Sequence, residues 1–207
     1  MQKLNKDFYF NNDVTEIARA LLGKIVVTKF NGITTAARIV ETEAYAGIVD
    51  KASHAYAGRR TARTEIMFGE GGTAYVYLCY GIHHMFNVVT NENEKPDAVL
   101  IRGVEPVTGI DEMLRRSKKE KPDHSIGRGP GNAGKALGIF THHTGSSLLS
   151  THFFITGDGV TDVPVMCSKR IGVDYAGAHA KWLYRFFIKD NLHVTKHAFN
   201  KEAIELL

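Results

Sequence analysis

The chain has 207 residues, 43% of them hydrophobic, which is ordinary for a globular protein and sufficient for a core. No apolar run reaches the roughly 20 residues needed to cross a bilayer, and the first residues lead into no apolar signal core. The sequence therefore predicts neither a membrane protein nor an exported one, and we expect a cytoplasmic location. The net charge of +4 favours polyanionic partners, of which nucleic acid is the commonest.

The first elements of the chain are predicted by capping and turn residues. Asp13 is a typical N-cap for a helix over residues 14–22, and Gly23 is a natural stop. Residues 24–30 have the composition of a strand, and Asn31-Gly32 is a strong hairpin signal. We therefore expect the next strand to return antiparallel to the first.

A second hairpin is predicted in the middle of the chain. Residues 73–81 and 82–90 are rich in strand formers and meet at Tyr80-Gly81, where glycine permits the positive φ of a tight turn. Such a turn displays Tyr80 at its tip. Composition then predicts a strand, a helix and three more strands, over residues 98–105, 109–119, 150–156, 169–173 and 182–188.

These elements predict the α+β class. No linker separates two cores and no internal repeat is visible, so we expect a single domain over residues 1–207. Its architecture should be a curved, mainly antiparallel β-sheet with surrounding helices.

The cysteines and histidines indicate no metal centre. Cys79 and Cys167 lie far apart among strand-like residues, so free buried thiols fit best, although a pairing of the two stays open. His83-His84 and His142-His143 would point to opposite faces of a strand, so neither pair is a ready chelate. The His-Glu spacings of zinc enzymes are also absent.

The glycine-rich segment Gly129–Gly134 matches two nucleotide-binding patterns. It fits G-x-G-x-x-G, but a charged loop precedes it where that pattern requires a strand. With Lys135 it also mimics a P-loop, but Ala136 stands where a Ser or Thr hydroxyl should hold magnesium. We therefore expect a glycine-rich loop, whose backbone amides could at most cradle a DNA phosphate.

The stretch Arg38–Tyr45 alternates like a strand, in which successive side chains point to opposite faces. Ile39, Glu41, Glu43 and Tyr45 are therefore predicted to share one face. Two carboxylates on a core strand are costly unless they are paired or used. An edge strand with its polar face in water is the alternative for this stretch taken by itself.

A set of short motifs runs in order across nearly the whole chain. They are Arg38–Tyr45, His54, Met67-Phe68, Tyr75–Gly81, Asn87, Val99–Arg102, Glu105-Pro106, Gly129-Pro130, Arg170–Val173 and Trp182. Together they resemble the alkyladenine (3-methyladenine) DNA glycosylases of base excision repair. The resemblance implies a monofunctional enzyme that flips an alkylated purine, with hypoxanthine as a further candidate, out of double-stranded DNA. It would hydrolyse the N-glycosidic bond and leave an abasic site.

The resemblance also assigns the residues that would hold the flipped base. Tyr80 would insert through the minor groove and fill the gap in the helix. Tyr45, His54 and Tyr77 would form the walls of the base pocket, where electron-rich rings attract a cationic base by roughly 0.5–2 kcal/mol. Asn87 would crowd the pocket against the 2-amino group of guanine. Without the resemblance, tyrosines on strands are more often core residues.

Glu43 takes the position of the family's catalytic carboxylate. As general base it would deprotonate a water that attacks C1′ of the sugar, and its charge would stabilise the oxocarbenium-like transition state. Arg102 would keep Glu43 ionised and bind a flanking phosphate, and the backbone of Ile171, through its carbonyl, would orient the water. Glu41 is the rival for the catalytic role, but its family position makes it a structural carboxylate paired with an arginine.

Three further residues, Arg59, Thr61 and Met67, correspond to family positions that contact DNA. The resemblance implies a monomer without a cofactor or metal. The chain departs from the family after Gly129-Pro130-Gly131, where Asn132-Ala133 replaces the usual lysine and leucine. This departure weakens the expectation of phosphate binding by that loop, and the alternative is that Lys135 is the family's lysine in a displaced position.

Two other functions share part of this evidence. A module that recognises damaged DNA without cutting it would need the wedge and the stacking rings but not Glu43. A metal-dependent nuclease or phosphodiesterase would use the histidines, and its activity would be sensitive to chelators.

Overall fold

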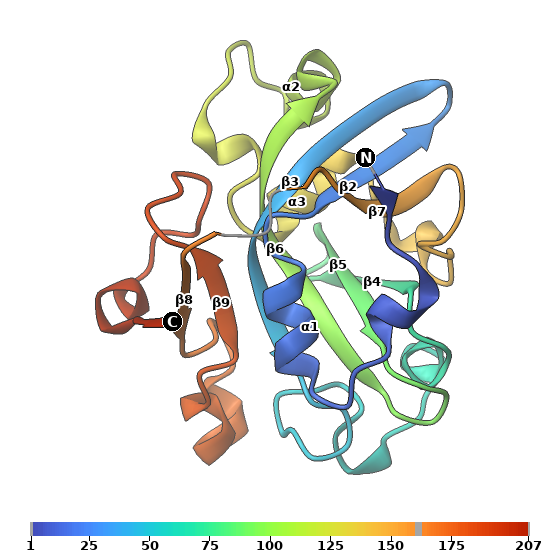
Figure 1. Cartoon of the computed structure of the whole chain (residues 1–207), viewed down its shortest axis with the longest axis vertical. Helices are drawn as coiled ribbons and strands as arrows, with labels where there is room; N and C mark the ends of the chain where they lie inside the picture. Colours follow the sequence, from blue (N-terminus) through green and yellow to red (C-terminus); the bar gives the residue numbers. More distant parts are fainter. Residues whose placement is uncertain (1, 160–162, 207) are drawn as a thin grey trace.

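The computed structural model describes residues 2–159 and 163–206, and within them ten strands form one antiparallel sheet. The main path of the sheet runs β1-β7-β2-β3-β6-β5-β4, while β9, β8 and β10 branch from β3 (Figure 1). The strands are β1 (Gln2–Lys3), β2 (Ile25–Phe30), β3 (Ile33–Tyr45), β4 (Thr73–Cys79), β5 (His83–Thr90), β6 (Asp97–Thr108), β7 (Phe153–Gly157), β8 (Val165–Ser168), β9 (Arg185–Ile188) and β10 (Ile204–Leu206). The α-helices are α1 (Val14–Ala20), α2 (Ile110–Ser117) and α3 (Pro130–Leu137).

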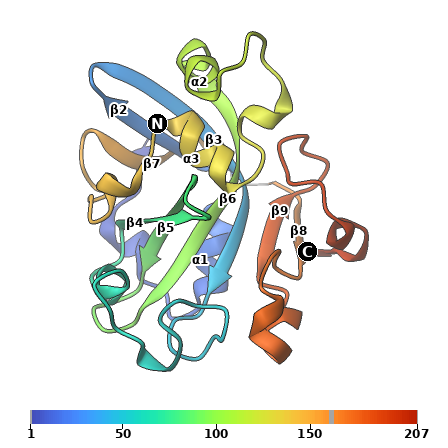
Figure 2. The same ribbon diagram turned by 180° about the vertical axis from the view of Figure 1, so that it is seen from behind.

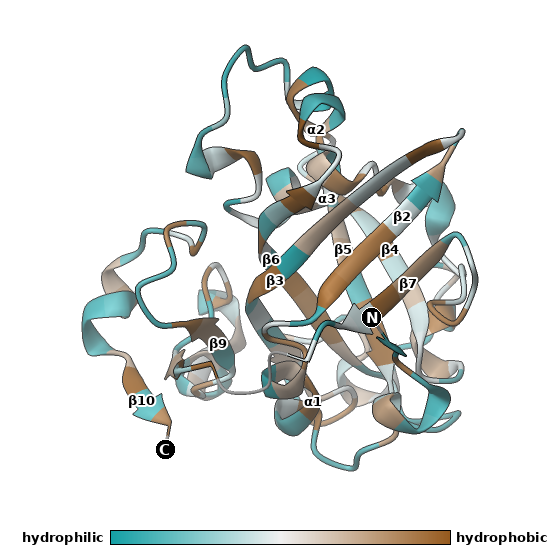
Figure 3. Cartoon of the chain, turned by 45° about the horizontal axis from the view of Figure 1, so that its top comes forward, coloured by the Kyte–Doolittle hydropathy of each residue, from teal (hydrophilic) through white to brown (hydrophobic). Residues whose placement is uncertain are grey.

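This arrangement confirms the predicted α+β class with a mainly antiparallel sheet. Apolar residues are concentrated in the strands, whereas α2 and many connecting loops are polar (Figure 3). Strands β8 and β9 lie to one side of the main sheet, where β9 pairs with the second half of β3 and β8 pairs with β9 (Figure 2). In the described part of the chain, no helix has the length and apolar character needed to span a membrane.

The first predicted elements are confirmed almost residue by residue. Asp13 caps α1, since its Oδ1 accepts a hydrogen bond of 2.8 Å from the backbone N–H of Thr15. Asn31 and Gly32 both have positive φ, 51° and 75°, as a two-residue hairpin turn between β2 and β3 requires. The turn therefore brings β3 back along β2 and starts it toward the centre of the sheet.

Strand β3 contains an irregularity that the alternation did not predict. Ile39 lies opposite Val104 and Glu41 opposite Gly103, so Val40 is the extra residue of a β-bulge within the described register. Because of this bulge Ile39 packs in the main core, while Val40 packs with Phe187 of β9. The prediction that Ile39 shares a face with the two glutamates is wrong.

A compensating irregularity follows on β6. Glu41 lies opposite Gly103 and Thr42 opposite Ile101, which leaves Arg102 as the extra residue on β6 within the same register. A bulge can redirect a side chain, and here it turns Arg102 toward the two glutamates of β3. The sheet geometry therefore brings an arginine and two carboxylates together.

The segment predicted as a glycine-rich loop is a helix. Gly129 (φ 86°) precedes Pro130, which stands at the first position of α3, where its missing N–H costs nothing. A Cβ on Gly134 would lie 2.5 Å from the carbonyl oxygen of His84, so glycine lets α3 lie close against β5. The glycines serve helix packing, and the prediction of a loop is corrected.

The strand predicted over residues 169–173 is also wrong. After Ser168 ends β8, the chain leaves the sheet and turns inward, where Arg170 is buried to 1% exposure. The backbone N–H of Ile171 binds a side-chain carboxylate, where a strand residue would bind a neighbouring strand. The following strand, β9, begins at Arg185, three residues after Trp182.

Candidate active site

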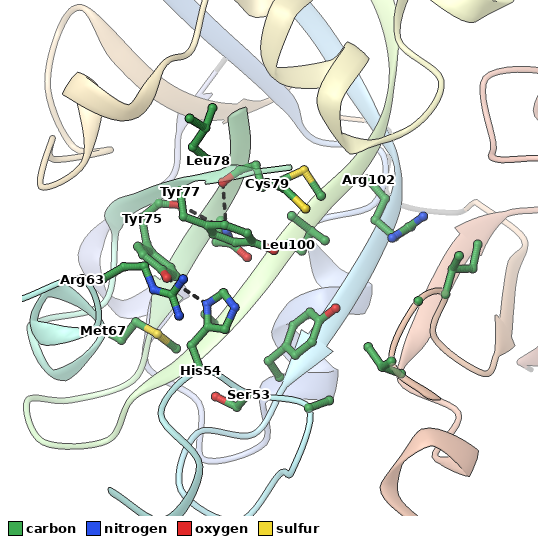
Figure 4. A pocket seen from close by; sticks show the side chains of 18 of the residues that line it. Ser53, His54, Arg63, Met67, Tyr75, Tyr77, Leu78, Cys79, Leu100 and Arg102 are labelled. Atoms are coloured by element: carbon green, nitrogen blue, oxygen red, sulfur yellow. Dashed lines mark hydrogen bonds between the residues drawn. The ribbon is translucent and has the colours of Figure 1, made fainter. Parts of the chain in front are cut away.

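A cavity of about 390 Å³ opens beside β3, β4 and β5 (Figure 4). Its size is that of a site for a small molecule or a single base. The walls come from the ends of β3 and β6, from β4 and β5, from the segment 52–67 and from the loop 171–175. The lining residues are Tyr45, Ala52, Ser53, His54, Arg63, Met67, Tyr75, Tyr77, Leu78, Cys79, Tyr80, Met85, Asn87, Ala98, Leu100, Arg102, Ile171, Gly172, Val173 and Tyr175.

Aromatic rings form one side of this cavity. Tyr75 and Tyr77 occupy alternate positions of β4, so both point to the same side of the sheet. The ring of His54 meets that of Tyr77 edge to face, with centroids 4.7 Å apart, and its Nδ1 lies 2.9 Å from the hydroxyl of Tyr75. The structure thus brings together Tyr45, His54 and Tyr77, the three predicted pocket walls.

The histidine in this wall is uncharged at neutral pH. Burial, and then the guanidinium groups of Arg63 and Arg59, lower the pKa of His54 to about 4. Burial likewise raises the pKa of Tyr75 to about 12 and raises that of Tyr77, so both phenols stay protonated. The three rings therefore present a neutral, electron-rich surface to the cavity.

Glu43 lies directly behind the cavity and is fully buried. Among the described residues, three donors contact its carboxylate, and all three belong to residues that line the cavity. The hydroxyl of Tyr45 and Nη1 of Arg102 donate to Oε2 over 2.8 and 3.2 Å, and the N–H of Ile171 donates to Oε1 over 2.8 Å. A carboxylate offers about four acceptor sites, so this arrangement leaves one on Oε1. The contact with Ile171 is made by its N–H, whereas the resemblance points to its carbonyl.

The charge of Arg102 is divided between two carboxylates. Its Nε donates to Glu41 over 3.2 Å, while its Nη1 donates to Glu43. Glu41 also accepts from Nε of Arg185 over 2.7 Å, and from the N–H and hydroxyl of Thr195. Glu41 is thus paired with arginines, as expected, and its two oxygens are occupied by these donors.

The pKa shifts of this cluster follow from its charges. Burial alone would raise the pKa of Glu41, but Arg102, Arg185 and Thr195 bring that pKa below its usual value. Burial opposes the charge of Arg102, yet Glu43 and Glu41 raise the pKa of this arginine. Glu41 and Arg102 are therefore both ionised, and their opposite charges offset each other inside the protein.

The remaining predicted site residues fall into three places. Asn87 lines the cavity, with its Nδ2 donating to the carbonyls of Tyr75 and Met85. Tyr80 stands at the rim with positive φ (50°) and is 91% exposed. Met67 is buried and lines the cavity, whereas Arg59 and Thr61 lie on the exposed surface outside it.

Several lining residues were missed from the sequence. Tyr75 packs in a core cluster and also lines the cavity, and its alternation with Tyr77 is the signal that places both on one face. Arg63 belongs to a charged run that carried no assignment, and its guanidinium lies beside His54 and Tyr75 (Figure 4). Tyr175, 71% exposed, is fixed at the rim by a hydrogen bond to the carbonyl of Ala52, and no sequence signal pointed to it.

The two cysteines are not joined to each other. Cys79 and Cys167 are free thiols, the second of them buried. In the described ranges, no group of three or more His, Cys, Asp or Glu side chains is placed to hold a metal ion.

Comparison with known proteins identifies the family. Residues 8–192 match the model of the methylpurine-DNA glycosylase family. The chain belongs to this family. A relative from Clostridium perfringens (strain 13 / Type A) is 43% identical over 204 residues, covering 94% of this chain and 99% of the relative. Relatives from Desulfitobacterium hafniense (strain Y51) and Chlamydia felis (strain Fe/C-56) are 39% and 42% identical, over 94% and 89% of this chain and 99% and 95% of their own lengths.

All three relatives carry the name "Putative 3-methyladenine DNA glycosylase". Membership of the methylpurine-DNA glycosylase family confirms the resemblance drawn from the short motifs. It also confirms the predicted class of enzyme, a DNA glycosylase.

Proposed function

We propose that this methylpurine-DNA glycosylase family member removes alkylated purines of the 3-methyladenine type, and more slowly hypoxanthine, from double-stranded DNA. The damaged nucleotide is flipped out of the helix into the cavity, because a stacked base cannot be reached. Glu43 then activates a water that hydrolyses the N-glycosidic bond. The product is an abasic site, and no covalent enzyme intermediate forms.

The observation that carries this proposal is the position of Glu43. Its carboxylate is buried directly behind an aromatic cavity and is held by donors from three lining residues, Tyr45, Arg102 and Ile171. The acceptor site left on Oε1 is available to a water at the sugar end of the cavity. A buried carboxylate with this support can serve as a base without losing its orientation.

The reaction balances with these groups alone. As the bond between C1′ and the base nitrogen breaks, its electron pair leaves with the base, and positive charge develops on the sugar beside Glu43. The water oxygen bonds to C1′, and its proton passes to Oε1 of Glu43. A cationic alkylated base becomes neutral on leaving. Hypoxanthine is neutral in DNA and leaves as an anion unless it is protonated, so we expect its release to be slower.

The cavity walls favour a cationic base. Rings of Tyr45 and Tyr77 attract a cation over their faces, and the neutral His54 adds no repulsion at physiological pH. Asn87 has its amide nitrogen fixed by two carbonyls, so its position in the cavity is rigid. We propose that this rigid side chain excludes guanine through its 2-amino group.

Residues outside the cavity hold the DNA. Tyr80, at the hairpin tip, inserts into the gap left by the flipped nucleotide. Arg59 and Thr61 lie on the exposed segment next to the cavity and contact the backbone, while the buried Met67 contacts the base from within. The enzyme acts as a monomer in this proposal, which light scattering of the free protein and of its DNA complex tests.

Glu43→Gln tests the proposal against a module that only binds damaged DNA. Duplexes containing 3-methyladenine or hypoxanthine are incubated with wild type, with Glu43→Gln and with Glu92→Gln, a control at an exposed glutamate. We expect wild type and control to release free base and Glu43→Gln to lose base release by about 10²–10⁴-fold while still binding DNA. Unchanged turnover by Glu43→Gln contradicts the proposal. Activity that disappears in EDTA supports a metal-dependent enzyme instead.

A further inference from the structure

Arg170 is a buried arginine beside the cavity to which the proposed reaction gives no role. Its side chain is completely buried, and it pairs with Asp50, which is also completely buried. Nη1 donates to the carbonyl of Ala44 over 2.8 Å, and Nη2 donates to Oδ1 of Asp50 over 3.0 Å and to the carbonyl of His179 over 3.2 Å. One guanidinium thus ties together the end of β3, the segment around residue 50 and the loop after β8.

The same guanidinium lies against two tyrosine rings. Its central carbon is 4.8 Å from the ring centroid of Tyr45 and 5.4 Å from that of Tyr184. Arginine attracts the faces of aromatic rings through its charge and its planar shape. Tyr45 is therefore supported from inside the protein by Arg170, while it lines the cavity on the other side.

Two of the three donors to Glu43 depend on this arrangement. The hydroxyl of Tyr45 and the N–H of Ile171 donate to different oxygens of the carboxylate, each over 2.8 Å. The first belongs to the ring that contacts Arg170, and the second belongs to the next residue in the chain. Moving Arg170 would displace both donors together.

We propose that Arg170, held by Asp50, is a positioning residue for cleavage of the N-glycosidic bond. It fixes the Tyr45 hydroxyl and the Ile171 N–H, and through them the direction in which Glu43 presents its remaining acceptor site. Arg170 itself touches neither the base nor the water. The inference rests on the proposed function, because it assumes that Glu43 is the base.

Lysine cannot take over this role. Its ammonium is a single point, so it cannot bind Asp50, Ala44 and His179 at once in a fixed plane, nor lie flat between two rings. Arg170→Lys keeps the charge but loses the geometry. Asp50→Asn keeps the shape of the partner but weakens its hold on Arg170. Tyr184→Leu removes one of the two rings at a half-buried position and leaves an apolar side chain there.

The experiment measures single-turnover base release, affinity for a duplex with an uncleavable abasic analogue, and thermal unfolding. Arg38→Lys is the matched control, because Arg38 also pairs with an aspartate, Asp158, but lies outside the cavity lining. We expect Arg170→Lys to lower the rate of base release by about 10–100-fold. Asp50→Asn and Tyr184→Leu should lower the same rate by a similar factor. All three variants should keep the wild-type affinity for DNA. Hydrogen bonds to a carboxylate favour its charged form. Because these variants weaken such hydrogen bonds, the acid limb of the plot of release rate against pH should move to higher pH.

The outcomes separate the possible failures. If folded Arg170→Lys and Asp50→Asn release base at the rate of Arg38→Lys, the inference is overturned. It is also overturned if rate and affinity fall together with no movement of the acid limb, which is the result of a merely structural role. If Arg170→Lys and Asp50→Asn do not fold, the same criteria are applied to Tyr184→Leu. An active Glu43→Gln would instead remove the proposed function on which the inference rests.

Discussion

The hydroxyl of Tyr45 donates a hydrogen bond of 2.8 Å to Oε2 of Glu43, and the two residues occupy alternate positions of β3. Burial, and then the charge of Glu43, raise the pKa of Tyr45, so the phenol keeps the proton that it donates. A ring that lines the cavity is therefore joined directly to the carboxylate behind it. In the proposed function, recognition of the base and support of the reacting group would therefore share one side chain.

Tyr45→Phe separates these two contributions. The ring remains in place while the donor disappears, and a hydrogen bond to a charged group contributes about 1.5–3 kcal/mol. We expect base release to slow by about 10–100-fold, with affinity for lesion-containing DNA unchanged. Single-turnover kinetics and fluorescence anisotropy check the two quantities. A variant with the wild-type rate would show that Glu43 does not need this donor.

Tyr80→Ala tests the wedge. Because the side chain is 91% exposed, the free energy of unfolding should stay within about 0.5 kcal/mol of wild type. Affinity for a lesion in duplex DNA should fall, whereas affinity for the same lesion in a single strand should not, since only the duplex needs its gap filled. Ile204→Ala, at another exposed apolar position, is the control and should change neither affinity. Equal losses on both substrates would argue against insertion.

Glu41→Gln tests the pairing of the buried carboxylate through acid stability. The folded pKa of Glu41 lies below its usual value of 4.5, so the unfolded state binds its proton first as the pH falls. Its stabilising contribution is therefore complete above pH 4.5 and is lost as the pH falls through the folded pKa. We expect the melting temperature of Glu41→Gln to be lower than that of wild type at neutral pH. Below pH 4.5 the melting temperature of the variant should fall less steeply with decreasing pH. Parallel curves for variant and wild type would disprove the pairing.

His54 gives a second titration test, in a higher pH range than Glu41, because its ordinary pKa is 6.5. Its pKa falls from 6.5 to about 4 on folding, so between these values the unfolded state binds more protons and stability decreases as the pH decreases. We expect the imidazole resonance of His54 to titrate near pH 4 by NMR, and base release to persist down to about pH 5 without a histidine limb. Arg63→Gln should raise the pKa of His54, because the charge of Arg63 is one of the effects that lower it. A titration near 6.5 in wild type would contradict the buried, neutral histidine.

The parts of the fold that could be predicted are those that local residues determine. Asp13 caps a helix, and Asn31-Gly32 and Tyr80-Gly81 turn hairpins, because each needs only its own backbone conformation. The same local logic correctly placed Tyr80 at an exposed tip. Motif resemblance then supplied the identity of the pocket residues, which spacing alone could not give.

The parts that could not be predicted depend on contacts between distant segments. The bulges at Val40 and Arg102 arise from how β3 and β6 align, and alternation within one strand carries no trace of them. The interior position of Arg170 depends on Asp50, which lies far away in the sequence. A strand-like composition at residues 169–173 was therefore misleading, because a buried ion pair decides the local structure there.

The close approach of Gly134 to His84 has a consequence for the hairpin that carries Tyr80. Helix α3 rests on the strand that leads away from the hairpin tip, and a methyl group at position 134 would push against backbone that cannot yield. If the hairpin enters the minor groove as proposed, its stiffness there depends in part on Gly134, which lies on the helix behind it. Gly134→Ala would push α3 away from β5, and in the proposed function the hairpin would then insert less firmly into DNA.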